Sequence, residues 1–121
     1  MTEIKVKRTY DDAAAEDGFR ILVDRLWPRG LSKEKFHYDL WEKDLAPSTR
    51  LREWYHADTE GRAGAFDARY EAELNANPAL PAFVRTVREH PVVTFLYSSK
   101  DRKDNNAKVL RKVVMQRLGE G

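Results

Sequence analysis

Two short segments of the sequence bring together side chains that could hold an anionic ligand. The first, at residues 24–30, reads Asp-Arg-Leu-Trp-Pro-Arg-Gly. In it Arg25 and Arg29 could each bind a phosphate or carboxylate through two parallel hydrogen bonds, and Trp27 could offer a flat wall for stacking. The same pattern fits an internal ion pair between Asp24 and an arginine, beside a core tryptophan, because charges at the end of a sheet need partners. The sequence leaves both interpretations open.

The second segment runs from the end of an apolar stretch into a polar loop. It supplies four further candidates for ligand binding: Tyr97, Ser98, Lys100 and Asn105. The loop leads into a helix, whose first backbone N–H groups are unpaired and attract anions. The alternative is that Asp104 or Asn105 caps this helix and that the lysines are merely solvated.

A third group lies at residues 41–48, where Lys43 is another candidate for contact with an anion. Carboxylates at such a site could act as general acids or bases, and the three candidates are Asp24, Asp44 and Asp101. Ser48 is better placed as the N-cap of a helix than as a nucleophile. No Gly-x-Ser-x-Gly pattern surrounds it or the serines at 98 and 99, so a serine nucleophile has no support.

Periodicity in the sequence predicts the elements that would position these side chains. Alternation at residues 4–9 indicates a short strand with one wet face, and the apolar runs 19–27 and 92–97 indicate buried strands. Residues 37–45 give a weaker strand pattern. Amphipathic helices are expected after Ser48, from Gly61, after Pro78 and after the loop that ends at Asn105.

Strands that alternate with helices predict an α/β fold. We expect a single compact domain over residues 1–121, with a small, mostly parallel sheet flanked by helices. In such sheets ligands bind beyond the carboxyl ends of the strands. Residues 24–30 and 97–105 each leave a buried strand at that end, so their side chains are expected to face one crevice.

Composition excludes several kinds of chemistry. None of the 121 residues is Cys, which excludes thiol nucleophiles, Cys-ligated zinc and iron–sulfur clusters and favours a reducing, cytoplasmic setting. The three histidines are too scattered for metal-ligand spacing, so no metal is expected. The glycines form no phosphate loop or dinucleotide fingerprint, and the sequence names no cofactor.

The sequence also bears on possible partners. No stretch approaches the roughly 20 apolar residues of a membrane helix, and the first residues lack the apolar core of a signal peptide, so no membrane association is expected. The formal charge is only +2, yet residues 98–121 hold seven basic and three acidic side chains. The pattern gives no indication of oligomeric state.

Part of this positive charge lies on the last helix. Lys108, Arg111 and Lys112 share one face of it, which would suit an interaction module for protein or nucleic acid. The pI of 8.9 falls just short of the level typical of nucleic-acid-binding domains, and no aromatic side chains interleave the patch. A solvated helix face therefore fits better than a nucleic-acid interface.

Several motifs, taken in order, resemble a known family. They are RILVDRLWPRG at 20–30, WEKDLAPS at 41–48, LREWYH at 51–56 and LYSSKD at 96–101, followed by Asn105 and Ala107. They are similar to the YeaO-like bacterial proteins, which carry the domain of unknown function 488. The resemblance covers nearly the whole chain and implies a compact α/β domain, but it supplies no reaction.

One departure from the family pattern affects the candidate chemistry. The family usually places His after the loop asparagine, whereas here Asn105 is followed by Asn106. More distant relatives carry Cys at the strand end and a Cys-His pair at the helix start, where this chain has Tyr97 and the two asparagines. The resemblance therefore implies a retained site without acid–base or thiol chemistry, which favours ligand binding over covalent catalysis.

These observations lead to one main hypothesis and two alternatives. A small anionic molecule, such as a nucleotide or phosphorylated metabolite, would bind at the carboxyl ends of the central strands. There Arg25, Arg29 and Lys100 would neutralise it, and Trp27 and Tyr97 would form the walls. The first alternative is an interaction module that uses the basic last helix. The second is a hydrolase or transferase with an aspartate as general base.

Overall fold

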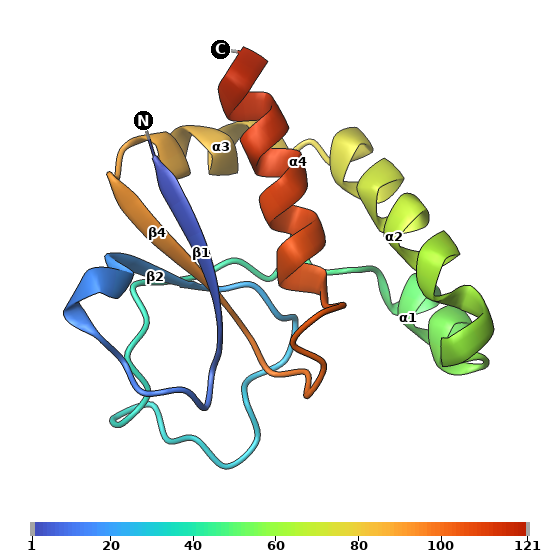
Figure 1. Ribbon diagram of the computed structural model, residues 1–121, viewed down its shortest axis with the longest axis horizontal. Helices are drawn as coiled ribbons and strands as arrows, with labels where there is room; N and C mark the ends of the chain where they lie inside the picture. Colours follow the sequence, from blue (N-terminus) through green and yellow to red (C-terminus); the bar gives the residue numbers. More distant parts are fainter. Residues whose placement is uncertain (1, 121) are drawn as a thin grey trace.

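A computed structural model describes residues 2–120. It shows one sheet of strands with helices packed on it (Figure 1). In chain order the elements are β1 (Glu3–Arg8), the 3-10 turn η1 (Ala15–Asp17), β2 (Phe19–Leu22), β3 (Leu40–Trp41), α1 (Thr49–His56), α2 (Thr59–Ala76), α3 (Leu80–Arg88), β4 (Val92–Tyr97) and α4 (Asn106–Glu120). Within this described part, no helix is both long and apolar enough to cross a membrane.

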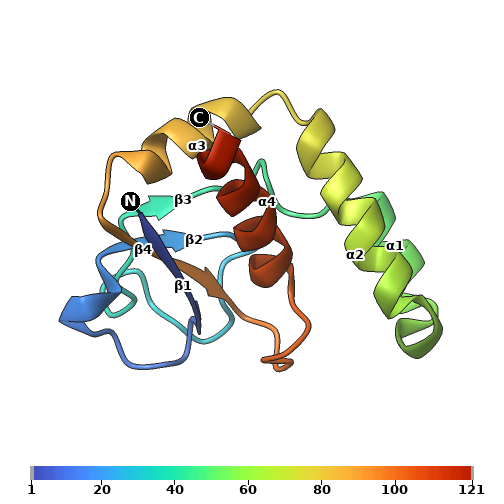
Figure 2. The ribbon, with the colours of Figure 1, turned by 45° about the horizontal axis from the view of Figure 1, so that its top comes forward.

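The four strands form a parallel sheet in the order β1-β4-β2-β3. β4 lies between β1 and β2, with Phe95 opposite Val6 on one side and Ile21 on the other. Figure 2 shows the short β3 beside β2, at the edge away from β1. The predicted α/β class with a small, mostly parallel sheet is confirmed, and every strand pair is parallel.

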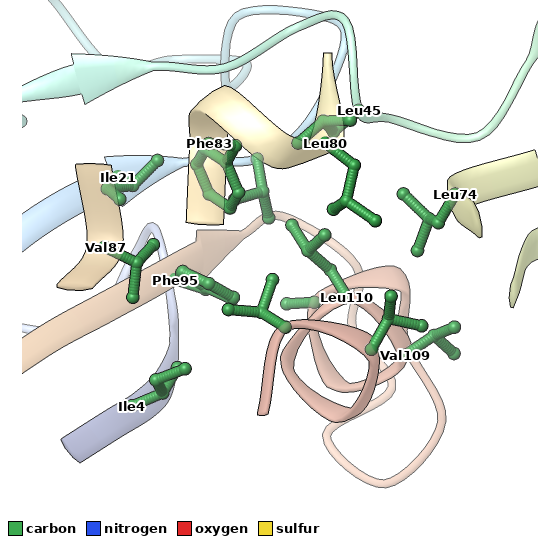
Figure 3. Close-up of a cluster of buried hydrophobic side chains, with 14 of the residues drawn as sticks. Ile4, Ile21, Leu45, Leu74, Leu80, Phe83, Val87, Phe95, Val109 and Leu110 are labelled. Atoms are coloured by element: carbon green, nitrogen blue, oxygen red, sulfur yellow. The ribbon is translucent and has the colours of Figure 1, made fainter. Parts of the chain in front are cut away.

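One face of the sheet carries the main hydrophobic core. Successive side chains of a strand point to opposite faces, so Ile21 and Phe95 turn toward the helices together. The apolar stripe of α3, which includes Leu80 and Phe83, and Leu110 of α4 pack over them (Figure 3). α2 adds Tyr70 and Leu74, and the Tyr70 hydroxyl donates a hydrogen bond to the Leu45 carbonyl.

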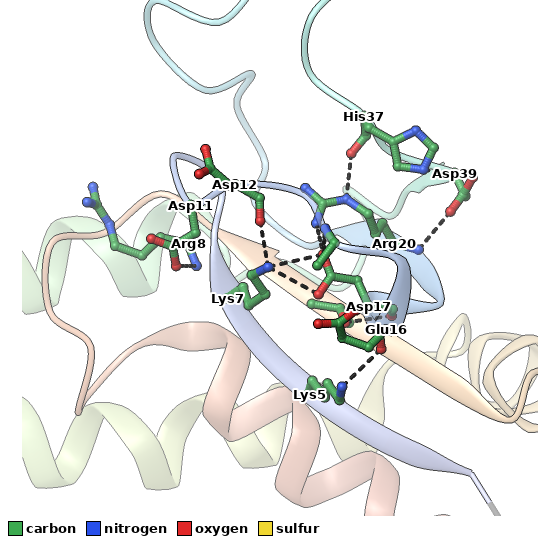
Figure 4. A network of polar contacts seen from close by, with 12 residues as sticks. Lys5, Lys7, Arg8, Asp11, Asp12, Glu16, Asp17, Arg20, His37 and Asp39 are labelled. Carbon is green, nitrogen blue, oxygen red and sulfur yellow. Dashed lines mark hydrogen bonds and ion pairs between the residues drawn. The ribbon is translucent and has the colours of Figure 1, made fainter.

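The other face of the sheet is covered by η1 and by irregular segments instead of α-helices, and one part of this cover is polar. Arg20 of β2 and Asp17 of η1 form a buried ion pair, each only 2% exposed. Lys7 of β1 approaches both carboxylate oxygens of Asp17 at 3.1 Å, and the network continues to the His37 carbonyl (Figure 4). The connector between β1 and β2 is thereby fixed to the sheet by charge.

Another part of this cover is aromatic. Leu22 and Leu96 contribute buried apolar side chains from the sheet. Trp27 lies over them and meets three further rings edge-on at centroid distances of 5.4–5.6 Å: Phe36, Tyr38 and Trp41. This cluster holds the long connection between β2 and β3 in place although the connection contains no helix or strand.

β2 is shorter than the apolar run predicted. It ends at Leu22, and Val23 makes one more backbone hydrogen bond to the sheet, whereas the sequence predicted a strand to residue 27. The chain bends at Asp24 because the side chain of Asp24 binds the backbone of Ser98, and its carbonyl accepts a hydrogen bond from Trp41. The expected strand at 37–45 is likewise reduced to the two residues of β3.

Candidate functional site

The carboxyl ends of β2 and β4 open into a groove with a volume of about 480 Å³. The segment after β2, the loop after β4 and the first turn of α4 form one side of it. Side chains from α1 and α2 form the other side. Residues from both predicted segments, 24–30 and 97–105, therefore line the same groove, as the parallel topology leads one to expect.

Asp24 joins the two segments. Its Oδ2 accepts a hydrogen bond of 2.8 Å from the backbone N–H of Ser98, and its Oδ1 accepts one of 3.0 Å from the side-chain amide of Asn106. The arginine partner that one interpretation gave to Asp24 is not seen among the described residues; backbone and amide groups bind the carboxylate instead. Asn106, the residue at which a departure from the family pattern was expected, therefore lies within hydrogen-bond reach of Asp24.

The loop after β4 is shaped by its own side chains. Asp101 accepts hydrogen bonds from the backbone N–H groups of Lys103 and Asp104. Asn105 is buried, its amide donates to the Asp101 carbonyl, and its Oδ1 accepts from the backbone N–H of Lys108. Asn105 is thus the cap of α4, which was one of the two predicted possibilities.

A second contact fastens this loop to the connector after β1. The guanidinium of Arg102 donates two hydrogen bonds, of 3.0 and 2.8 Å, to the carboxylate of Asp11. These bonds, together with the Arg8 backbone N–H, hold the pKa of Asp11 at about 2, below its usual 3.8. The Arg8 side chain donates to the carbonyls of Ser98 and Ser99.

The contact between Arg102 and Asp11 leads to a prediction about the pKa of the Asp11 carboxyl group. An NMR titration of the Asp11 carboxyl group is expected to show a midpoint near 2. Arg102→Gln should move the midpoint up toward 3.8, because it removes the hydrogen bonds and the charge that favour the ionised form. Lys103→Gln removes a charge from the same loop without touching Asp11 and should leave the midpoint nearly unchanged. If the midpoint shifted equally in the two variants, the contact between Arg102 and Asp11 would not be the cause of the low pKa.

Three arginines line the groove with their charges unpaired: Arg25, Arg29 and Arg52. Among residues 2–120, none of their side chains donates a hydrogen bond or joins an ion pair. Arg25 and Arg29 are exposed and Arg52 is half-buried on α1. Guanidinium groups in this state can bind a carboxylate or phosphate bidentately without first breaking an internal pair.

The groove also carries acidic side chains. Besides Asp24 and Asp101, whose oxygens accept hydrogen bonds from the protein, Asp67 of α2 and Asp104 face it. Burial raises the pKa of Asp67, and the negative charges of Asp104 and Glu71 raise it further. The groove therefore presents arginines and carboxylates together, and its polar lining can discriminate between ligands by charge.

Seven of the eleven candidate residues line the groove: Asp24, Arg25, Trp27, Arg29, Ser98, Asp101 and Asn105. The other four lie elsewhere. Tyr97 is buried in the core, and the Lys43 ammonium lies 4.2 Å from the centroid of the Trp41 ring. Asp44 and Lys100 are exposed outside the groove lining.

Several lining residues were not found by sequence reasoning. Arg52, Tyr55, Phe66 and Asp67 come from α1 and α2, and Tyr10 comes from the connector after β1. The helix pattern at 48–56 indicated which residues of α1 are apolar, but it does not say that this helix turns toward the strand ends. Asn106 was singled out only as a departure from a family pattern; its bond to Asp24 depends on the fold.

The basic face of α4 is mostly engaged within the molecule. Arg111 donates to the Ile4 carbonyl at the edge of the sheet, and Lys112 pairs with Glu71 at 3.2 Å. Lys108 is exposed. Two of the three side chains that suggested an interaction surface therefore have intramolecular partners.

Comparison with known proteins agrees with the motif pattern. The chain matches, over residues 3–121, the family model described as "Inactive DUF488-N3 subclade". It is 41% identical over 107 residues to the uncharacterized protein YeaO of Escherichia coli, which covers 88% of this chain and 92% of that protein. It is 40% identical over 113 residues to the uncharacterized protein Rv3073c of Mycobacterium tuberculosis, covering 93% and 94% of the two chains.

The names of these relatives assign no ligand and no reaction. No solved structure matches the chain. The family match spans almost all of the sequence, and the shared identity extends over most of both relatives. The chain therefore belongs to the YeaO-like proteins of the DUF488 family.

Proposed function

We propose that this protein binds a small anionic ligand, bearing a phosphate or carboxylate, in the groove at the carboxyl ends of β2 and β4. The observation that carries the proposal is the set of three arginines that line one groove without an internal partner among the described residues. Arg25 and Arg29 are exposed to solvent and Arg52 is half-buried, so an anion can bind their guanidinium groups without breaking an internal ion pair. Several guanidinium groups that converge on one groove suit a bidentate contact with a phosphate or carboxylate.

Other features favour binding over turnover. The family model is described as inactive. Both oxygens of Asp24 are occupied by hydrogen bonds from Ser98 and Asn106, and the groove holds no cysteine. Asn106 cannot exchange a proton near neutral pH as a histidine would. A cytoplasmic setting, suggested by the absence of cysteine, belongs to the same proposal.

The experiment is an NMR titration of the 15N-labelled protein with methyl phosphate and with acetate. Binding should shift the backbone amides of residues 24–30 and 98–106 in a saturable way. Arg29→Ala should weaken binding about tenfold, since a charge-assisted hydrogen bond contributes about 1.5 kcal/mol or more. Arg85→Ala, which removes an exposed arginine on α3 away from the groove, serves as the control and should leave affinity unchanged.

Two further results bear on the proposal. Lys100→Ala should change affinity by less than about twofold, because Lys100 does not line the groove. If neither anion shifts the groove amides, or if Arg29→Ala and Arg85→Ala act alike, the proposal is wrong.

A further inference from the structure

We infer that the ligand of this groove carries an aromatic ring next to a single anionic group. The inference rests on the proposed anion site and adds the chemical class of the rest of the ligand. It comes from the apolar part of the groove, which the arginines do not explain.

Exposed apolar side chains are concentrated at this groove. Among residues 2–120, three large apolar side chains are exposed: Leu26 at 64%, Met115 at 44% and Tyr10 at 42%. Two of them, Leu26 and Tyr10, line the groove, and Met115 lies on α4. Exposed apolar groups gathered at a polar-rimmed groove mark a surface that a ligand covers, whereas a single one such as Met115 needs no explanation.

Aromatic rings from the strand ends and from α1 and α2 line the groove. Trp27 on the strand-end side is fixed by a hydrogen bond from its Nε1 to the Leu31 carbonyl and by its edge-on neighbours. On the helical side, Tyr55 of α1 and Phe66 of α2 pack with ring centroids 4.6 Å apart. Rings held this rigidly offer stacking and edge-on contacts to a planar ligand at little cost in conformational entropy.

The apolar and cationic parts of the groove are physically joined. The Tyr10 hydroxyl donates a hydrogen bond of 2.8 Å to the Arg29 carbonyl, so the Tyr10 ring is held beside the backbone that carries the Arg29 side chain. A guanidinium can also stack on a planar ring while it binds an anion. A ligand with the ring and the anion close together would use both features at once.

The size and the charge of the groove restrict the class of ligand further. A volume of about 480 Å³ is in the range of small-molecule sites. Asp67 and Asp104, which line the same groove, would repel a polyphosphate. The site thus favours an aryl phosphate or aryl carboxylate with one charged group.

The test compares phenyl phosphate with methyl phosphate, which carry the same charged group and differ in the ring. Phenyl phosphate is expected to bind about tenfold more tightly, because burying part of a ring contributes about 1.4 kcal/mol. Leu26→Ser should reduce this preference by about threefold or more, since it removes apolar surface from the groove. Met115→Ser, the matched change at the exposed apolar residue outside the groove, should leave the preference intact.

Each outcome separates this inference from the proposed function. Equal affinity for the two phosphates, with binding still weakened by Arg29→Ala, overturns the inference and leaves the anion site standing. Equal affinity for phenyl phosphate and neutral phenol, unaffected by Arg29→Ala, overturns the anion site. If neither phosphate binds and acetate does not bind either, both fail. A dimer detected by sedimentation and dissociated by Leu26→Ser would also overturn the inference, since a second copy would then cover the apolar side chains.

Discussion

Asp17→Asn is expected to destabilise the protein by about 3–5 kcal/mol at neutral pH, because it leaves the buried guanidinium of Arg20 without its counter-charge. Removing one partner of a buried pair costs far more than the pair itself contributes. The asparagine keeps one acceptor oxygen where the carboxylate has two, so it cannot accept from Arg20, Lys7 and the Ala14 N–H as Asp17 does. All of these groups lie under the connector between β1 and β2, so the variant should loosen that whole region.

The effect has a definite pH dependence. Burial by itself would raise the pKa of Asp17, but hydrogen bonds from the Ala14 N–H and from Lys7, the charge of Lys7 and the bond from Arg20 together hold the pKa below 3.8. A carboxyl group with a lowered pKa in the folded state stabilises the protein above its unfolded pKa of about 3.9. This stabilisation is lost as pH falls from about 4 toward the folded value, so the difference between the two proteins should shrink there.

The measurement is urea unfolding of both proteins at pH 7 and at a series of lower pH values. Asp12→Asn is the matched control: Asp12 lies in the same connector, its side chain is exposed, and only its backbone carbonyl contacts Lys7. Asp12→Asn should lower the free energy of unfolding by less than about 0.5 kcal/mol. Similar losses in the two variants would show that the connector, and not the buried pair, sets the stability.

Local patterns in the sequence were sufficient to predict the elements whose stability is local. Residues 92–97 form β4, because a continuous apolar run fits a strand covered on both faces. The expected N-cap at Ser48 is confirmed by a 3.1 Å hydrogen bond from the Leu51 N–H to its hydroxyl. The parallel arrangement also followed from the order of strands and helices, and it brings residues 24–29 and part of the loop after β4 to one groove.

Features that depend on distant contacts could not be predicted. β2 ends early because Asp24 binds the backbone of Ser98, which is 74 residues away in the chain. The apolar run gives no sign of that contact. Arg52 and Asp67 reach the groove only because α1 and α2 turn toward the strand ends, and helix periodicity says which face of a helix is buried but not against what. The residues at the strand ends could therefore be predicted, because they follow from the topology of the sheet. The residues from α1 and α2 could not, because they depend on how the helices pack.

Asp24 should be the residue on which the groove depends most. Asp24→Ala is expected to cost about 2–3 kcal/mol of stability, because the Ser98 N–H and the Asn106 amide both lose their acceptor. Two half-buried donors without partners are expensive, although water reaching them reduces the cost. The loop after β4 would lose its attachment to the segment after β2, so binding of methyl phosphate should be lost as well.

Asp24→Asn should have a smaller effect and should lower the free energy of unfolding by about 1 kcal/mol or less. The new amide keeps one oxygen for the Ser98 N–H, and the Asn106 amide can turn so that its own oxygen accepts from the new NH2 group. Asp44→Ala is the control, since that candidate aspartate is exposed and its side chain makes no hydrogen bond or ion pair in the described part of the chain. Its effect should be within about 0.5 kcal/mol.

Urea unfolding and amide hydrogen exchange at Ser98 measure both parts of this prediction. In Asp24→Ala the Ser98 amide should exchange faster by about tenfold or more relative to the parent, while Asp24→Asn should retain most of its protection. If the alanine and asparagine variants behave alike, then the negative charge of Asp24, and not its place as a double acceptor, is what holds the two sides of the strand end together.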